Sequence, residues 1–257
     1  MIRDVQMQND NRNIPIDRVG VKDLSYPITL LNRHGGVQHT VASINMYVNL
    51  PHHFRGTHMS RFIEILNEHH RELHIDAVAK ILEKTKARLE AEEAHMEICF
   101  PYFIEKKAPV SGAESLMEYK CSYTGTLTKK ADFILGVEVP VTTLCPCSKE
   151  MSEEGAHNQR SLVKIAIRAK KLVWIEELVE LAEAAASSPV YALLKREDEK
   201  AVTEQAYKNP KFVEDVVREV SSSLQKDSRI IWYRVESENM ESIHNHNAYA
   251  QIERYND

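Results

Sequence analysis

The chain has 257 residues, of which 43% are hydrophobic and 28% are charged, a balance typical of folded globular proteins rather than disordered or fibrous ones. The net charge is −5 and no dense Lys/Arg stripe is present, which argues against a nucleic-acid partner. No apolar run approaches the roughly 20 residues that span a bilayer and the N-terminus has no signal-peptide core, so we expect a cytoplasmic protein without a membrane partner.

The first predicted elements are an arm, a hairpin and two helices. Residues 1–24 are rich in Asp, Asn and Arg and predict an arm that is poorly ordered or docks on a partner. Two extended runs over residues 27–50 flank the glycines of residues 33–36, which suit a hairpin turn. Apolar residues at helical spacing then predict helices over residues 60–67 and 75–93.

The rest of the chain roughly repeats this order of elements. The predicted strands cover residues 95–103, 115–127, 131–141, 161–169, 229–236 and 248–253, and the predicted helices cover residues 175–186 and 210–224. The pattern predicts an α+β protein of two tandem modules, each an antiparallel sheet with helices on one face. We place the modules at residues 25–145 and 146–257. Their joint is the segment richest in reactive side chains, and ligand sites favour such joints.

The segment VPVTTLCPCSKEMSEEGAHNQRS, residues 139–161, carries the strongest chemical signal. Cys145 and Cys147 are too close for an easy mutual disulfide, and such a pair in a cytosolic protein favours metal binding or thiol catalysis over buried, inert thiols. His157 follows Cys145 by twelve positions, within loop reach of a shared metal. The mixed thiolate and imidazole set suits zinc or a similar divalent ion. A packing histidine is the alternative.

Two further groups are ambiguous by spacing. His244 and His246 would share one side of an extended segment, where metal ligation, proton transfer and plain surface exposure all stay open. Glu199 and Glu214 are not special by spacing, because the chain has 38 acidic residues and most of them must be solvated surface charges.

The segment RGTHMSRF, residues 55–62, predicts a helix start that offers donors to an anion. Thr57 or Ser60 can cap the helix, and a helix N-terminus attracts negative charge. A plain capped helix is the alternative. The candidate donors are Arg55, His58 and Arg61.

Four segments together resemble GTP cyclohydrolases of the IB type: RGTHMSRF, PVTTLCPCSKEMSEEGAHNQRS, SSPVYALLKREDEKAVTEQAYKNPKFVEDVVR and ESIHNHNAYA. They span nearly the whole chain, in order. The resemblance implies the tunnelling fold (T-fold), whose two tandem modules per subunit join into β-barrels within a homotetramer. It also implies the conversion of GTP and water to 7,8-dihydroneopterin triphosphate and formate, the first step of tetrahydrofolate biosynthesis, through attack of metal-activated water at guanine C8.

The resemblance further implies a metal site and a catalytic set. Its metal ligands fall on Cys145, His157 and Glu199, with zinc or manganese as the ion. Cys147 would lie beside the metal. The implied catalytic residues are Cys145, Cys147, His244 and His246.

The substrate contacts are also implied by the resemblance. Glu214 would accept hydrogen bonds from the guanine N1–H and exocyclic amine, an edge that adenine lacks. His244 and His246 would lie near the reacting atoms and suit proton transfer, because imidazole changes charge near neutral pH. The nominated triphosphate donors are Arg55, His58, Arg61, Lys149 and Arg160.

Two other functions stay open at this point. A non-catalytic metal-binding or metal-delivery protein would use Cys145 and Cys147 as a soft pair, and would need neither a guanine-sized pocket nor triphosphate donors. A different T-fold enzyme acting on a pterin or purine, such as an aldolase or a reductase, would share the anchoring role of Glu214. Analysis of the product separates these alternatives.

Overall fold

The structure is a computed structural model that describes residues 6, 8–69 and 75–256. The chain forms two compact units, each built from two stretches of sequence. The first unit comprises Met1–Pro101 and Ser122–Ile134, and the second comprises Tyr102–Cys121 and Leu135–Asp257. Both contain antiparallel strands and helices, which confirms the predicted α+β class.

The border between the units crosses three strands, which therefore belong to both: β3 (Ala94–Lys107), β4 (Glu114–Leu127) and β5 (Ala131–Leu144). A single cut near residue 145 does not separate the compact units, because strand segments that precede it complete the sheet of the second unit. The predicted tandem modules, residues 25–145 and 146–257, differ from these compact units, and the division into modules stays a prediction.

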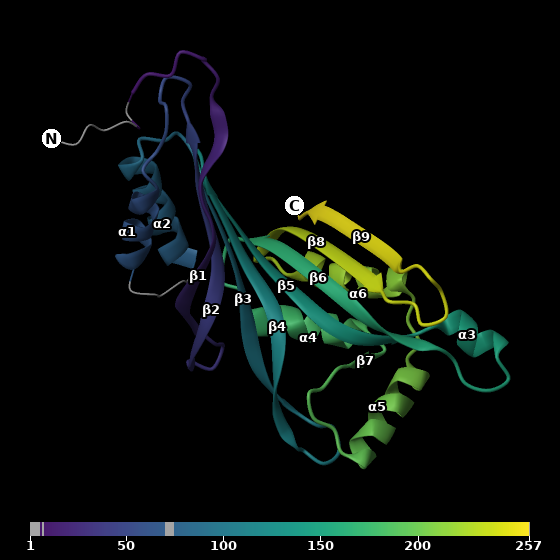
Figure 1. The fold of residues 1–257 in the computed structure, drawn as a ribbon. Helices are drawn as coiled ribbons and strands as arrows, with labels where there is room; N and C mark the ends of the chain where they lie inside the picture. The colour runs from purple at the N-terminus through teal and green to yellow at the C-terminus, as the bar shows by residue number, and fades with distance from the viewer. Residues whose placement is uncertain (1–5, 7, 70–74, 257) are drawn as a thin grey trace. The chain divides into compact units, whose positions relative to one another are not determined.

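In the first unit, β1 (Ile16–Leu31) and β2 (Val37–Leu50) form the predicted hairpin, drawn in purple in Figure 1. The strand begins earlier than expected, so the polar residues 16–24, predicted as part of an arm, lie in β1. A side chain on Gly20 would collide with the backbone of Met46 on β2, so glycine permits the close approach. Backbone pairing of this kind needs no apolar side chains, which explains why the composition of the segment misled the prediction.

Two helices, α1 (Met59–Asn67) and α2 (Ile75–Arg88), pack against each other in the first unit, and α1 contacts β1 (Figure 1). The buried residues of α1 are Phe62, Ile65 and Leu66, a spacing that gives a helix one apolar face. Both helices confirm the prediction, although α2 ends at Arg88 rather than near residue 93. Glu90 has a positive φ of 53°, a conformation that ends a helix.

The sheet of the second unit continues from β5 through β6 (Asn158–Ala169) and β8 (Ile230–Asn239) to β9 (Ala248–Tyr255), and the short β7 (Ser188–Pro189) pairs with β5. Alternate residues of β6 are buried, as the period of a strand requires. The helices α4 (Ile175–Ala185) and α6 (Val213–Lys226) pack together, and α6 covers β8 and β9 (Figure 1). The predicted antiparallel sheet with helices on one face is confirmed for this unit.

One helix of the second unit, α5 (Arg196–Lys208), is not predicted from the sequence. Its start is fixed by Asp198, which is fully buried. The carboxylate accepts the backbone N–H groups of Val110, Ser111 and Lys195, each at 2.8 Å. Burial alone would raise the pKa of Asp198, but hydrogen bonds from these three residues outweigh it and hold the pKa well below its usual range. The carboxylate thereby ties the turn between β3 and β4 to α5.

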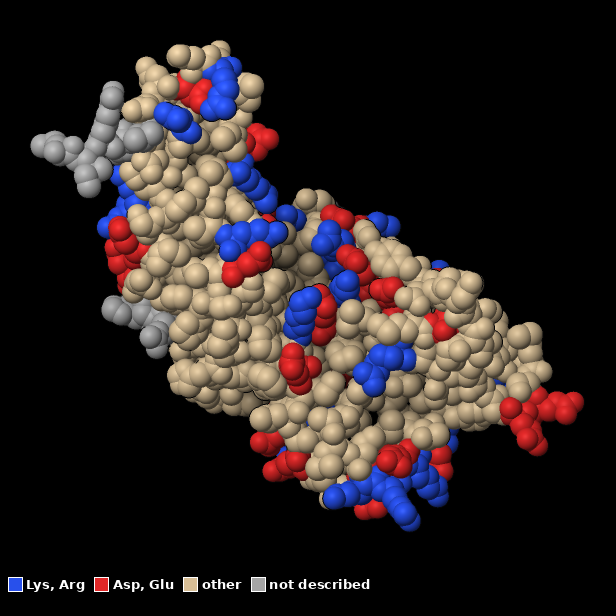
Figure 2. Space-filling view, in the orientation of Figure 1, with Lys and Arg blue, Asp and Glu red and all other residues tan. Residues whose placement is uncertain are grey.

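On the face drawn in Figure 2, positive and negative side chains lie next to one another in scattered groups, separated by uncharged surface. Mixing of this kind gives that face no extended basic area of the type that binds nucleic acid. Within the described residues, no helix is long and apolar enough to cross a membrane.

Candidate active site

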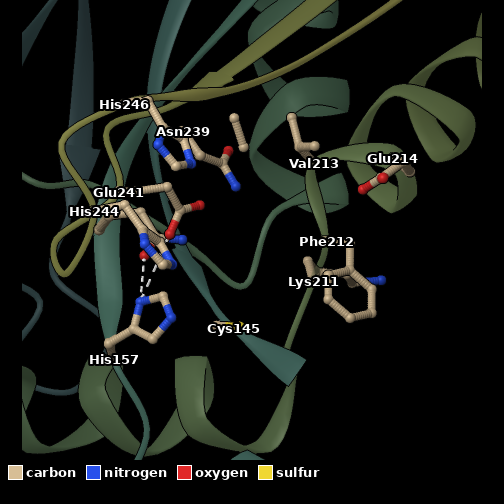
Figure 3. Close-up of a pocket in the computed structure, with 12 residues that line it drawn as sticks. Cys145, His157, Lys211, Phe212, Val213, Glu214, Asn239, Glu241, His244 and His246 are labelled. Carbon is tan, nitrogen blue, oxygen red and sulfur yellow. Dashed lines mark hydrogen bonds and ion pairs between the residues drawn. The ribbon is translucent and has the colours of Figure 1, made fainter. Parts of the chain in front are cut away.

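A pocket of about 310 Å³ lies in the second unit, near the end of β5 and the start of β6 (Figure 3). Its lining comes from the ends of these strands, from the first turn of α6 and from the connection between β8 and β9. The volume is at the lower end of the range for ligand pockets. The reactive side chains in the lining belong to Cys145, His157, Glu214, Glu241, His244 and His246.

Cys145 and His157 are brought together by strand pairing. Leu144, the last residue of β5, is opposite Asn158, the first residue of β6. The residues just beyond the paired ends must therefore be neighbours. The Cys145 N–H donates to the His157 carbonyl at 3.1 Å.

The connection between these strands contains α3 (Pro146–Met151), another helix that the sequence does not predict. Proline suits the first helical position, because an N–H there would have no partner within the helix. Cys145 is the N-cap, and its Sγ accepts the Ser148 N–H at 3.4 Å. The Ser148 hydroxyl accepts the His157 N–H at 3.2 Å. One helical turn therefore holds both Cys145 and His157.

Three polar side chains approach the Nδ1 atom of His157. Its Nδ1 lies 3.0 Å from Gln159 Oε1 and 3.5 Å from the Ser242 hydroxyl, and the Glu241 carboxylate is 3.8 Å away. The side chains of His157 and Glu241 are only 11% and 13% exposed. Neither Gln159 nor Glu241 is a predicted site residue.

His244 and His246 lie on a bend between β8 and β9 rather than on a strand. Their exposed rings stack, with centroids 5.1 Å apart and an angle of 16° between the ring planes. Both line the pocket, on the same side as His157 in Figure 3. The alternation of a strand is therefore not what brings them together.

Glu214 lies on the first turn of α6, across the pocket from His157 and His244 in Figure 3. The segment before the helix is held by the Lys211 N–H, which donates to the Leu144 carbonyl at 3.0 Å. This bond places the start of α6 beside the end of β5. The pocket thus has the imidazoles and the Glu241 carboxylate on one side and the Glu214 carboxylate on the other (Figure 3).

Asn239, at the end of β8, has a buried amide oxygen without a partner. The residue is 2% exposed, and no hydrogen-bond partner for its Oδ1 occurs within the described part of the chain. A polar atom buried in this way costs about 1–3 kcal/mol, and the residue lines the pocket. The sequence analysis missed it, although Val235, Ser237 and Asn239 alternate on the buried face of β8. A polar residue at a position where the alternation of the strand predicts a buried side chain could have pointed to Asn239.

Comparison with known proteins decides the family. A model of the type I GTP cyclohydrolase folE2 family matches residues 2–250. The chain belongs to this family. It is 61% identical to the GTP cyclohydrolase FolE2 of Geotalea uraniireducens, over 98% of this chain and 93% of that protein. It is also 61% identical to the FolE2 protein of Geobacter sulfurreducens, over 98% of this chain and 97% of that one. The predicted resemblance is confirmed.

Solved structures show a related fold at low identity. The uricase from Arthrobacter globiformis aligns with a TM-score of 0.53 and 8% identity, over 93% of each chain. The urate oxidase from Bacillus subtilis aligns with a TM-score of 0.54 and 6% identity, over 93% of this chain and 98% of that one. The likeness is one of fold alone, and it supports the predicted antiparallel sheet with helices.

The three predicted metal ligands do not lie together in the pocket. Cys145 and His157 line the pocket, whereas Glu199 is exposed on α5 and is absent from the lining. Within the described residues, no group of three or more His, Cys, Asp or Glu side chains is arranged to hold a metal ion. Asp198 turns inward, and neighbouring helical residues point about 100° apart, so Glu199 faces away. Cys147 is exposed on α3 and does not line the pocket either.

The predicted triphosphate donors also lie outside the pocket lining. Arg61 donates to the Arg88 carbonyl at the end of α2, at 2.9 Å, and Arg55 donates to Gln8 Oε1 at 2.9 Å. Lys149 donates to the Tyr207 carbonyl at 2.6 Å. Of the other donors, Arg160 is exposed on β6 and His58 is the N-cap of α1. Arg55, His58 and Arg61 belong to the first unit, and the pocket belongs to the second.

Proposed function

We propose that this folE2-family chain converts GTP and water to 7,8-dihydroneopterin triphosphate and formate, the first step of tetrahydrofolate biosynthesis. Family membership supports the reaction. The observation that carries the site is the division of the pocket, with Cys145 and three imidazoles facing the Glu214 side (Figure 3). A purine placed between the two sides would meet an anchor at its pyrimidine ring and proton-transfer groups at its imidazole ring.

Glu214 is the proposed anchor for guanine. The guanine edge presents N1–H and the exocyclic amine side by side, and a carboxylate accepts both hydrogen bonds in a bidentate arrangement. Adenine carries an acceptor where guanine carries N1–H, so the same carboxylate would reject it. The buried Oδ1 of Asn239 supports a polar ligand in this pocket, because a donor from the bound molecule would satisfy it.

The chemistry requires several proton transfers. Water adds at guanine C8, the imidazole ring opens, and a second water releases C8 as formate. The sugar then rearranges, and closure of the new six-membered ring expels one water, so the net consumption is one water. His244 and His246 are exposed to the pocket in a stacked pair, where they can take up and return protons to the reacting atoms.

A divalent metal, zinc or manganese, is the proposed cofactor. The fit is partial: Cys145 and His157 are adjacent and offer a thiolate and an imidazole, which zinc accepts together. Glu199 is proposed as the third ligand on the family resemblance alone. When bound, the ion would lower the pKa of water and make it a nucleophile for C8. Cys147 is proposed to assist beside the metal, and the triphosphate is assigned to the nominated cationic donors.

The proposed assembly is a homotetramer in which T-fold modules join into β-barrels. Among the residues that the structure describes, the outermost strands of the sheet, β1 and β9, each pair on one side only, and such edges recruit further strands. Tyr249 and Tyr255 on β9 are exposed, which suits a surface that another copy covers. No disulfide joins any of the four cysteines, in keeping with a reducing cytoplasm. A fully active monomer in light scattering would overturn this assembly.

One experiment tests the function. Purified protein, reconstituted with zinc or manganese, is incubated with GTP, and the products are assayed for formate and for a fluorescent pterin after oxidation. Both products are expected in equal amounts. Metal binding without formate would favour a metal-delivery protein, and turnover of a pterin instead of GTP would favour an aldolase or reductase of the same fold.

A further inference from the structure

We propose that Gln159 is a positioning residue that holds His157 with its Nδ1 proton turned toward the protein and its Nε2 lone pair turned to the pocket. Only the role of Nε2, as a metal ligand or a proton acceptor, rests on the proposed function. The tautomer itself is a property of the folded chain.

The hydrogen bonds that carry this inference run inward from the pocket. His157 Nδ1 lies 3.0 Å from Gln159 Oε1, and Gln159 Nε2 donates to Thr143 Oγ1 at 2.9 Å. Thr143 Oγ1 is in turn 2.7 Å from the Ser161 hydroxyl. Thr143 and Ser161 are fully buried, and Gln159 is 7% exposed. The amide is therefore held at both ends away from solvent.

The surroundings of Nδ1 decide which way the amide faces. A glutamine side chain can be turned end for end, which would present its NH2 group to His157 and require the proton on Nε2. The Glu241 carboxylate and the Ser242 hydroxyl also approach Nδ1, at 3.8 and 3.5 Å. An ionised carboxylate can only accept. At 3.8 Å the carboxylate is too far to accept a hydrogen bond, but its charge favours a proton on Nδ1. That proton is donated to Gln159 Oε1 and leaves Nε2 free to act as an acceptor.

The hydrogen bonds of Gln159 are not required to hold β5 and β6 together. β5 and β6 are paired without interruption from Leu135 opposite Ile167 to Leu144 opposite Asn158. The backbone already fixes the register, so the hydrogen bonds of Gln159 are not needed to join the strands. Ligand imidazoles in metalloproteins commonly donate their other N–H to an acceptor of this kind, which sets the tautomer and the ring orientation.

The test is nitrogen NMR of the metal-free protein with 15N-labelled histidine, at a pH where imidazole is neutral. We expect His157, identified by loss of its signals in His157→Asn, as the Nδ1–H tautomer. Gln159→Met keeps the length but removes the acceptor, so His157 should become a mixture of tautomers. Gln159→Glu keeps an acceptor and should restore the Nδ1–H form. A wild-type Nε2–H tautomer, or no change in Gln159→Met, overturns the proposal.

A second readout is the affinity for Co²⁺, followed by the absorption of the cobalt–thiolate pair. Gln159→Met should lose about 10- to 100-fold in affinity, and Gln159→Glu should lose much less. Thr143→Val removes the hydroxyl that supports Gln159 and should shift the tautomer, whereas Thr85→Val replaces the hydroxyl of another fully buried threonine and should not. If Gln159→Met does not fold, the Thr143→Val and Gln159→Glu pair still decides the outcome. Failure of GTP turnover would leave the metal-free tautomer result intact, so the two proposals fail separately.

Discussion

The Cys145 N–H donates to the His157 carbonyl at 3.1 Å, although twelve positions separate the two residues. The bond continues the ladder between β5 and β6 by one step. The pair is therefore set by backbone geometry rather than by a bound ion, and it should persist when the metal is absent.

The first prediction follows from this backbone support. Exhaustive chelation should abolish GTP turnover, because the proposed water activation is lost, while the far-UV circular dichroism spectrum stays unchanged. Adding back zinc or manganese should restore the rate. The thermal midpoint should rise with metal concentration, as for any ligand of the native state. Turnover at the full rate in metal-free protein would show that the metal role is wrong.

Much of the fold follows from sequence periodicity, and much of the site does not. The hairpin, the first pair of helices and the later strands have clear apolar spacing. The helix α5 does not, since its start depends on Asp198 reaching Val110 and Ser111, far away in sequence. Glu241 and Asn239 become site candidates only when their burial is known. The short connection between Cys145 and His157 predicts that they lie close together. The position of Glu199 could not be predicted, because it lies on α5.

The second prediction concerns stability at low pH. Arg229 donates to Asp227 and Glu177, joining the turn after α6 to the first turn of α4. The hydrogen bonds from Arg229 are the main reason that the pKa values of both carboxyl groups are lowered. A lowered pKa in the folded state means that the stabilisation is present above the unfolded pKa and is lost as the pH falls through the folded value.

Arg229→Met should therefore lower the free energy of unfolding by about 1 kcal/mol at pH 7, and the difference from wild type should shrink below pH 4. Urea titrations at pH 7 and at about pH 3 measure it. A control is Lys120→Met, which removes an ion pair with Glu138 between more exposed side chains and should change little at either pH. An Arg229→Met effect that grows as the pH falls would contradict the assignment.

The third prediction tests the buried amide of Asn239. Asn239→Leu keeps the branched shape of the side chain and removes a polar atom that has no partner in the described chain, so the unfolding free energy should stay the same or rise. If the amide binds substrate, GTP affinity should fall at least tenfold in isothermal titration. Ser221→Ala is the matched control, because the Ser221 hydroxyl is also buried without a partner but does not line the pocket. Equal GTP affinity in the two variants would remove Asn239 from the site.

The last prediction separates the carboxylates, because Glu199 is assigned to the metal and Glu214 to guanine. Glu214→Gln keeps the shape but replaces an acceptor oxygen with an NH2 group, so one guanine N–H faces a donor. The cost is about 1–3 kcal/mol, and GTP binding should weaken while metal content stays normal. Glu199→Gln should lose metal affinity.

Glu241→Gln is the informative comparison, since Glu241 is a carboxylate that lies near His157 in this chain. Metal content by mass spectrometry and GTP binding by titration are measured on all three variants. Loss of metal from Glu241→Gln but not from Glu199→Gln would transfer the ligand role to Glu241. Loss of metal from Glu214→Gln, with tight GTP binding retained, would show that the roles of Glu199 and Glu214 are reversed.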